Sequence, residues 1–235
     1  MRAIGDNLQA VLQRIAHAAR DAGRDPAEVT LLAVSKTHPA ALVEQAMAAG
    51  QRAFGENYVQ EAVEKMDAVK GSPHLPEWHL IGPLQSNKTR VVAERFQWVH
   101  TLDREKTARR LSAQRPASAP PLNVLVQVNV SREASKSGIS MEETPSLVRQ
   151  ISSLPKLRLR GLMAMPEPGA ERARFHEVKD LFERLKSEFG FDTLSMGMSD
   201  DMETAIAEGA TMVRIGTAIF GQRGVGSRRQ ERNAA

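Results

Sequence analysis

Short apolar runs, often rich in β-branched residues, alternate with amphipathic stretches along most of the chain. The runs have the length of buried strands, and the stretches between them carry apolar residues at helical spacing. Strands are predicted at Val29–Ser35, Arg52–Gly55, Glu77–Ile81, Trp98–Leu102, Leu122–Val130, Arg158–Met163, Thr193–Met196 and Met212–Ile215. Helices are predicted between them at Pro39–Ala49, Asn57–Val69, Ser86–Phe96, Arg104–Gln114, Thr144–Leu154, Ala170–Glu188 and Asp200–Glu208.

This alternation indicates an α/β protein with a parallel sheet. In 235 residues, eight successive strand–helix units favour closure into a (β/α)8 TIM barrel over an open sheet. An extra N-terminal helix is predicted within residues 1–23. The proline-rich stretch 115–121 could link two domains, but strand and helix spacing resumes on both sides of it, which favours a surface connection. We therefore expect one domain over residues 1–235, no second β domain, and a frayed tail over 222–235.

Composition and charge narrow the function classes. The chain has no cysteine, which excludes disulfides and thiolate metal sites and fits a reducing cytoplasm. We expect neither a signal peptide nor a membrane span, because no segment is apolar for long enough. The net charge of +4 comes from 32 basic and 28 acidic residues that are mixed along the chain, with 4% aromatics. This mixture argues against nucleic-acid binding, which needs a clustered basic stripe.

Lys36 is the first candidate for chemistry. It follows the apolar run Val29–Ser35 and precedes a helix that Pro39 opens, so it is predicted to lie where a buried strand ends. A lysine in such a place can lose its proton through desolvation and act as a nucleophile toward aldehydes. The alternative is a lysine whose ammonium reaches the surface, the common case at an arbitrary strand end.

A second signal lies in the last predicted strand and its loop. Arg214 sits in an apolar strand, and a guanidinium does not readily lose its proton, so it needs an anionic or aromatic partner there. A salt bridge to an acidic neighbour is the purely structural alternative. Gly216 permits close backbone approach, and Thr217 adds a hydroxyl donor. Barrels often bind phosphate in the loops after strands 7 and 8, which here contain Ser199 and the pair Gly216–Thr217.

Other polar residues also fall at or after predicted strand ends. Glu56 and Asn57 follow the second strand, and His79 lies in the third. Asn57 and Ser199 could simply be helix N-caps. We interpret His79 as a core histidine with satisfied hydrogen bonds.

Together these features describe one ligand. An amine on strand 1, a phosphate cradle on loops 7 and 8, and a buried cation on strand 8 match the aldehyde, phosphate and ring nitrogen of pyridoxal 5′-phosphate (PLP). An arginine opposite the ring nitrogen favours the unprotonated pyridine, which weakens the ring as an electron sink. Lys136, after the fifth strand, is a secondary candidate for accepting the aldehyde during loading or release, with a solvated loop lysine as the preferred alternative.

Several motifs, in order and at family spacing from about Val29 to Gly221, resemble those of the pyridoxal phosphate homeostasis proteins. They are Ala33–Thr37, Phe54–Tyr58, His79–Lys88, Ser135–Gly138, Gly161–Met165, Ser195–Asp201 and Arg214–Gly221. The resemblance implies a barrel like the N-terminal domain of alanine racemases and a cytoplasmic protein that binds, buffers or delivers PLP.

The same resemblance implies roles for individual residues. Lys36 is implied as the Schiff-base lysine and Arg214 as the residue that faces the pyridine nitrogen. Asn57 is implied near the ring, and Ser199, Gly216 and Thr217 around the phosphate. PLP-dependent apo-enzymes are implied as recipients, and we expect a monomer or a weak dimer.

Three functions remain to be weighed. A racemase needs acid–base groups on both faces of the substrate carbon. In similar racemases one of these is a tyrosine from a second, β-rich domain, which we do not expect here. Tyr58, the single tyrosine, is expected to pack against the barrel rim. We therefore favour a PLP carrier without turnover, then a PLP-dependent racemase or deaminase, and last a Schiff-base aldolase that needs no cofactor.

Overall fold

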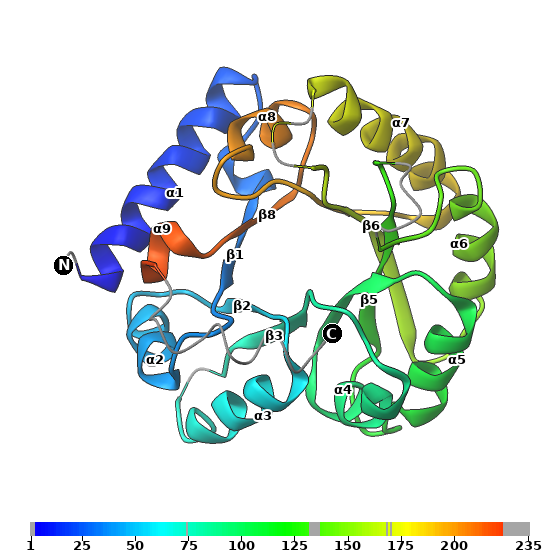
Figure 1. Cartoon of the computed structure of the whole chain (residues 1–235), viewed down its shortest axis with the longest axis horizontal. Coiled ribbons are helices and arrows are strands. Elements are labelled where there is room, and N and C mark those ends of the chain that lie inside the picture. The colour runs from blue at the N-terminus through cyan, green and yellow to red at the C-terminus, as the bar shows by residue number, and fades with distance from the viewer. Residues whose placement is uncertain (1–2, 74, 132–136, 168, 170, 223–235) are drawn as a thin grey trace.

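A computed structural model describes residues 3–73, 75–131, 137–167, 169 and 171–222. Eight strands form a closed barrel in which each strand pairs in parallel with its sequence neighbour and β8 pairs with β1 (Figure 1). The strands are β1 Thr30–Val34, β2 Ala53–Glu56, β3 Glu77–Leu80, β4 Trp98–Leu102, β5 Leu122–Val128, β6 Leu157–Ala164, β7 Thr193–Ser195 and β8 Met212–Ile215. The predicted (β/α)8 TIM barrel is confirmed.

Helices surround the barrel, as the outer ring of ribbons in Figure 1 shows. They are α1 Ile4–Asp21, α2 Ala40–Ala48, α3 Val59–Ala68, α4 Thr89–Arg95, α5 Glu105–Gln114, α6 Thr144–Ser152, α7 Arg172–Phe189, α8 Met202–Ala207 and α9 Thr217–Phe220. Two short 3₁₀ turns, Pro26–Glu28 and Ser86–Lys88, precede β1 and α4. The four-residue helix α9 was not predicted, because its length is too short for a periodic signal.

Strand boundaries agree with the predictions to within two residues, but six helices begin one to three residues later than predicted, among them α3 and α8. Helix α3 begins at Val59 rather than Asn57, and α8 begins at Met202 rather than Asp200. In both cases the residues that directly follow the strand form the loop at the carboxyl end of the barrel. The predicted tail 222–235 lies outside the described residues except for Gln222.

Apolar side chains fill the space between the barrel and its surrounding helices and also the interior of the barrel. The main cluster lies between the strands and the surrounding helices. Two smaller clusters, one containing Leu32, Ile81 and Met212 and the other Trp98 and Met163, are separate from it. Side chains of a strand alternate between its two faces, so we assign these small clusters to the barrel interior. The barrel is therefore a packed core whose open end can hold a ligand.

The extra N-terminal helix α1 lies beside α9 and α8 on the outside of the barrel (Figure 1). Its buried face carries Ile4, Leu8, Val11 and Ile15, and the Asn7 side-chain amide donates to the Ile219 carbonyl oxygen at 2.9 Å. This packing ties the start of the chain to the last barrel unit. Among the residues that the structure describes, no helix combines the length and apolar character needed to cross a membrane.

Candidate cofactor site

A cavity of about 260 Å³ opens at the carboxyl ends of the strands. It brings together every residue predicted to contact a cofactor: Lys36, Asn57, Ser199, Arg214, Gly216 and Thr217. The strands that carry most of these residues, β7, β8 and β1, are neighbours in the barrel (Figure 1). Sequence reasoning missed other lining residues, among them Thr101, Gln127, Met165 and Met198.

Lys36 lies two residues after the end of β1, as predicted, and is half-buried at the cavity wall. It is the second residue of a tight turn in which the His38 N–H donates to the Ser35 carbonyl oxygen at 3.1 Å. The third residue, Thr37, has φ +65°, in the left-handed region that β-branched residues rarely adopt. Backbone strain of this kind concentrates at functional sites.

A buried network of charges lies directly beneath this turn, and we call it the Lys65 network: Ser35, Thr37, Glu56, Glu61 and Lys65. The Lys65 ammonium donates to the Ser35 carbonyl oxygen at 2.6 Å, to Glu56 Oε1 at 2.7 Å and to Glu61 Oε1 at 2.6 Å. The Ser35 hydroxyl donates to Glu56 Oε1, and the Thr37 N–H donates to Glu61 Oε1, each at 2.6 Å. Three acceptors thus use all three ammonium donors.

Glu56 is the most deeply buried acid of this network. It is the last residue of β2, rather than the first residue after it as predicted, and its side chain is 0% exposed. Burial raises its pKa to about 7, although the Lys65 ammonium and the Ser35 hydroxyl oppose that shift. A carboxyl group with this pKa changes its charge near neutral pH.

Arg214 is buried in β8, at 4% exposure, and lines the cavity. The Asp201 carboxylate is the acid whose charge acts on Arg214, but within the part of the chain that the structure describes no salt bridge joins an acid directly to Arg214. Its guanidinium donates to the Ser195 hydroxyl at 2.9 Å and to the Ala164 carbonyl oxygen at 3.0 Å. Burial lowers its pKa to about 10, so it stays charged at neutral pH. Neutral acceptors hold it because backbone and hydroxyl oxygens can satisfy guanidinium N–H groups.

His79 is buried in the core, as predicted, but its hydrogen bonds are not all satisfied, because its Nε2 has no hydrogen-bond partner among the described residues. It is 1% exposed, stacks on Trp98 with ring centroids 5.1 Å apart, and lies 2.9 Å from the His100 ring nitrogen Nε2 through its Nδ1. His100 Nδ1 lies 3.2 Å from the Ser195 hydroxyl that accepts from Arg214. Burial lowers the pKa of both histidines. A chain of neutral polar groups, His79, His100 and Ser195, therefore leads through the barrel interior to the Arg214 guanidinium.

Two loops with hydroxyl groups face Lys36 from β7 and β8. Ser199 is not an N-cap: α8 begins three residues later, and the Asp201 carboxylate accepts the Met198 N–H at 2.5 Å within the loop. Glycine is favoured at position 216, because a β-carbon there would lie 3.0 Å from the Val34 carbonyl oxygen. Thr217 is exposed at the start of α9 and presents its hydroxyl at the rim of the cavity.

Asn57 is not an N-cap either, since α3 begins at Val59 and shows no side-chain cap. The loop that carries it packs against the loop after β3, where a β-carbon on Gly82 would lie 2.3 Å from the Asn57 carbonyl oxygen. Tyr58 lies in a neighbouring hollow and not in the cavity. Lys136 lies outside the described residues.

The donor set fits PLP. Lys36 supplies an amine, Arg214 a fixed cation, and Ser199 and Thr217 hydroxyl donors beside the close backbone of Gly216. The cavity wall between these groups includes the apolar side chains Val34, Ile81, Pro83, Met165 and Met198, which suits an aromatic ring.

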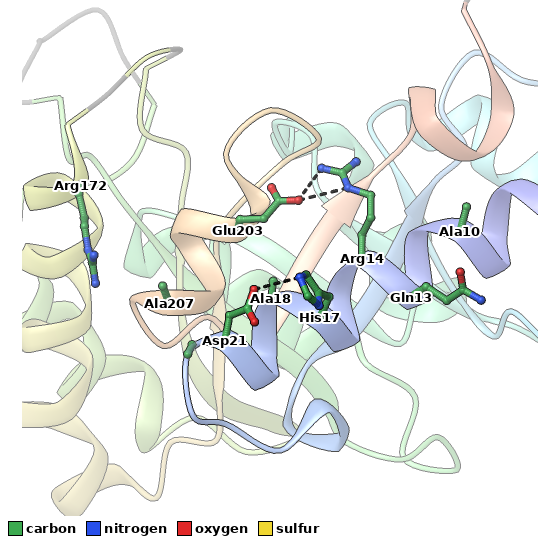
Figure 2. A pocket seen from close by; sticks show the side chains of 10 residues that line it. Ala10, Gln13, Arg14, His17, Ala18, Asp21, Arg172, Glu203 and Ala207 are labelled. Atoms are coloured by element: carbon green, nitrogen blue, oxygen red, sulfur yellow. Dashed lines mark hydrogen bonds and ion pairs between the residues drawn. The ribbon is translucent and has the colours of Figure 1, made fainter.

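A larger groove, of about 700 Å³, lies elsewhere, between α1, α8 and the start of α7 (Figure 2). Four of its charged side chains pair within the groove, Arg14 with Glu203 at 2.7 Å and His17 with Asp21 at 3.2 Å, and Arg172 pairs with Glu208, which lies outside the lining. The described residues that line it include no lysine. The groove therefore lacks the amine that an aldehyde ligand requires.

Comparisons with known proteins agree with this site. Residues 7–224 match the family described as the alanine racemase N-terminal domain. The chain is 60% identical over 232 residues to the pyridoxal phosphate homeostasis protein of Pseudomonas aeruginosa, with coverage of 97% of this chain and 99% of that protein. The protein of the same name from Escherichia coli K12 is 56% identical over 230 residues, with coverage of 95% and 98%.

A solved structure of a relative with PLP bound has the same fold as this chain. PipY of Synechococcus elongatus, determined with PLP bound, is 36% identical and superposes with a TM-score of 0.80, covering 93% of this chain and 100% of that one. The resemblance expected from the motifs is therefore confirmed over nearly the whole length. The chain belongs to the alanine racemase N-terminal domain family and, within it, to the pyridoxal phosphate homeostasis proteins.

Proposed function

We propose that this protein binds PLP covalently on Lys36 and buffers or delivers it in vitamin B6 homeostasis. The single observation that carries the proposal is the cavity that joins Lys36 to Ser199, Gly216 and Thr217 across the barrel mouth, with Arg214 in its wall. When bound, the cofactor supplies an aldehyde carbon that condenses with the lysine amine, its oxygen leaving as water with the two amine hydrogens.

The residues of this chain then divide the work. Lys36 provides the nucleophilic amine, and its half-buried position limits competing solvation. Ser199 and Thr217 would donate hydroxyl hydrogen bonds to the phosphate, and Gly216 would let it approach the backbone. Arg214 would present its positive charge to the ring nitrogen and so keep a proton off that atom, and Asn57 would lie near the ring.

We further propose that the protein does not turn over a substrate. Among the described residues that line the cavity, the titratable side chains are Lys36 and Arg214. A racemase needs a second acid–base group on the opposite face of the substrate carbon, and a buried arginine suits that role poorly. The names of the Pseudomonas and Escherichia relatives support the same proposal. We also propose that the protein acts in the cytoplasm and that PLP-dependent apo-enzymes receive the cofactor from it.

A borohydride experiment tests the attachment. The purified protein, incubated with PLP, should turn yellow, and reduction should fix the cofactor on the peptide that contains Lys36. Lys36→Ala should remain colourless. Lys88→Ala is the matched control, because Lys88 lies in the neighbouring hollow and does not line the cavity. Equal yellow colour and equal fixation in Lys36→Ala would reject Lys36 as the attachment site. Deuterium exchange from solvent into amino acids would contradict the absence of turnover.

A further inference from the structure

We propose that Glu61 and Lys65, together with Glu56, are positioning residues that fix the turn 35–38 and thereby aim the Lys36 amine into the cavity. The inference rests on the proposed function, because it concerns the lysine to which the cofactor attaches. It adds a role for a buried charge network that lines no part of the cavity.

The anchors hold the backbone on both sides of Lys36. On one side, Lys65 binds the Ser35 carbonyl oxygen at 2.6 Å while Glu56 binds the Ser35 hydroxyl at 2.6 Å. On the other side, Glu61 accepts the Thr37 N–H at 2.6 Å. With both neighbours fixed, the direction in which the Lys36 side chain leaves the backbone is fixed as well.

The turn needs such anchors. Thr37 has φ +65°, and its Oγ1 is buried with no hydrogen-bond partner among the described residues. A β-branched residue keeps such a conformation only when its surroundings enforce it. The Thr37 N–H to Glu61 bond is the contact best placed to do so. Without it, we expect the backbone to relax toward negative φ and to rotate the peptide that follows Lys36.

The charges matter as well as the contacts. The groups facing the turn are Glu56 from β2, Glu61 and Lys65 from α3, and Arg214 from β8 across the cavity, with His38 in the turn itself. Removal of the Lys65 charge raises the pKa of Glu56 further, so that this carboxyl group holds its proton, but it leaves the Glu61 carboxylate beside the turn without its cation. The negative charge of Glu61 favours the protonated amine of Lys36, which cannot attack an aldehyde. We therefore expect the reactivity of Lys36 to move to higher pH.

The test compares variants of the full chain. Lys65→Met removes the ammonium, and Glu61→Leu removes the acceptor of the Thr37 N–H, whereas Glu61→Gln keeps an acceptor oxygen. Arg115→Met is the matched control, because Arg115 is also a buried cation at 4% exposure that binds backbone carbonyl oxygens, those of Ala93, Phe96 and Pro120. It follows the C-terminal end of α5, at the end of the barrel away from the cavity.

Two readouts are needed. The first is the rate at which PLP is fixed on Lys36 by borohydride. The second needs no cofactor: formaldehyde and cyanoborohydride methylate Lys36, and peptide mass analysis gives the rate as a function of pH. We expect PLP fixation to be about tenfold slower in Lys65→Met and Glu61→Leu. Methylation in Lys65→Met should shift to higher pH. Glu61→Gln and Arg115→Met should stay within about twofold of the wild type.

Wild-type rates and pH profiles in Lys65→Met and Glu61→Leu would overturn the inference. So would an equal loss in Arg115→Met, which would assign the effect to general destabilisation. If Lys65→Met does not fold, the Glu61→Leu and Glu61→Gln pair decides alone. A wild-type protein that takes up no PLP would refute the proposed function, and the methylation profile would still test the positioning role.

Discussion

Glu56 gives a prediction in which the sign and the size of the effect follow from burial. Replacing it with glutamine keeps the shape of the side chain and an acceptor oxygen for Ser35 and Lys65, while removing the ionisable group. The glutamine amide resembles the protonated carboxyl group. At every pH, Glu56→Gln should therefore have the stability that the wild-type protein shows only at low pH, where Glu56 is protonated.

The magnitude comes from the raised pKa of Glu56, from 4.5 in the unfolded chain to about 7 in the folded protein. The folded protein holds this proton where the unfolded chain has lost it. Stability from this group is fully present below about pH 4.5 and is lost as the pH rises to about 7. The wild-type free energy of unfolding should fall by about 3 kcal/mol across that range. Above pH 7, Glu56→Gln should be more stable by this amount.

Urea unfolding of the cofactor-free proteins at several pH values measures this difference. His79 and His100 also change stability with pH, because burial lowers the pKa of each, so their contribution is lost as the pH falls below 6.5. Both proteins contain them, so subtraction of the two curves leaves the effect of Glu56. Parallel curves from acid to alkaline pH would show that Glu56 ionises normally and would refute the reasoning.

Two further substitutions test the local geometry. Thr37→Gly should raise the free energy of unfolding by about 1 kcal/mol, because the strain relieved at φ +65° exceeds the cost of the entropy that glycine adds to the unfolded chain. A variant that is less stable than the wild type in urea unfolding would show that Thr37 is not strained. Gly82→Ala should lower stability by about 1–3 kcal/mol and weaken PLP binding, because its β-carbon would lie 2.3 Å from the Asn57 carbonyl oxygen. Gly71→Ala, whose β-carbon would contact nothing within 4 Å, is the control, and equal effects of the two changes would reject the clash.

The sequence was sufficient for the barrel because its strands carry a strong local signal. Continuous β-branched and apolar runs mark strands buried on both faces, and β4 and β8 were predicted to the residue. Helix starts were less certain. Asn57 and Ser199 are good N-cap residues, but the loops that build the cavity extend past them. Local propensity cannot distinguish a cap from a residue that faces a ligand.

The six cavity residues were found because each departs from the pattern of a strand end, whereas the Lys65 network was missed. Glu61 and Lys65 are four residues apart on an amphipathic helix, a spacing typical of a solvated ion pair. Their burial is a tertiary property, created where α3 covers the turn after β1. The direct hydrogen-bond acceptors of Arg214 were also missed, because hydroxyl and backbone acceptors leave no charge signal in the sequence.

The positions of the acidic residues around the site help to decide whether the protein holds its cofactor or uses it to turn over a substrate. The described side chains that line the cavity are the Arg214 cation, the Lys36 amine and neutral groups, with no acid among them, a field that suits an anionic aldehyde. The nearest acids of the Lys65 network, Glu56 and Glu61, lie one layer below, where they bind the backbone beside Lys36 and the Lys65 ammonium. An acid that anchors the turn is not available to move a proton at a substrate. The chain thus uses its buried carboxyl groups to place one amine, and this favours a protein that holds PLP over one that acts through it.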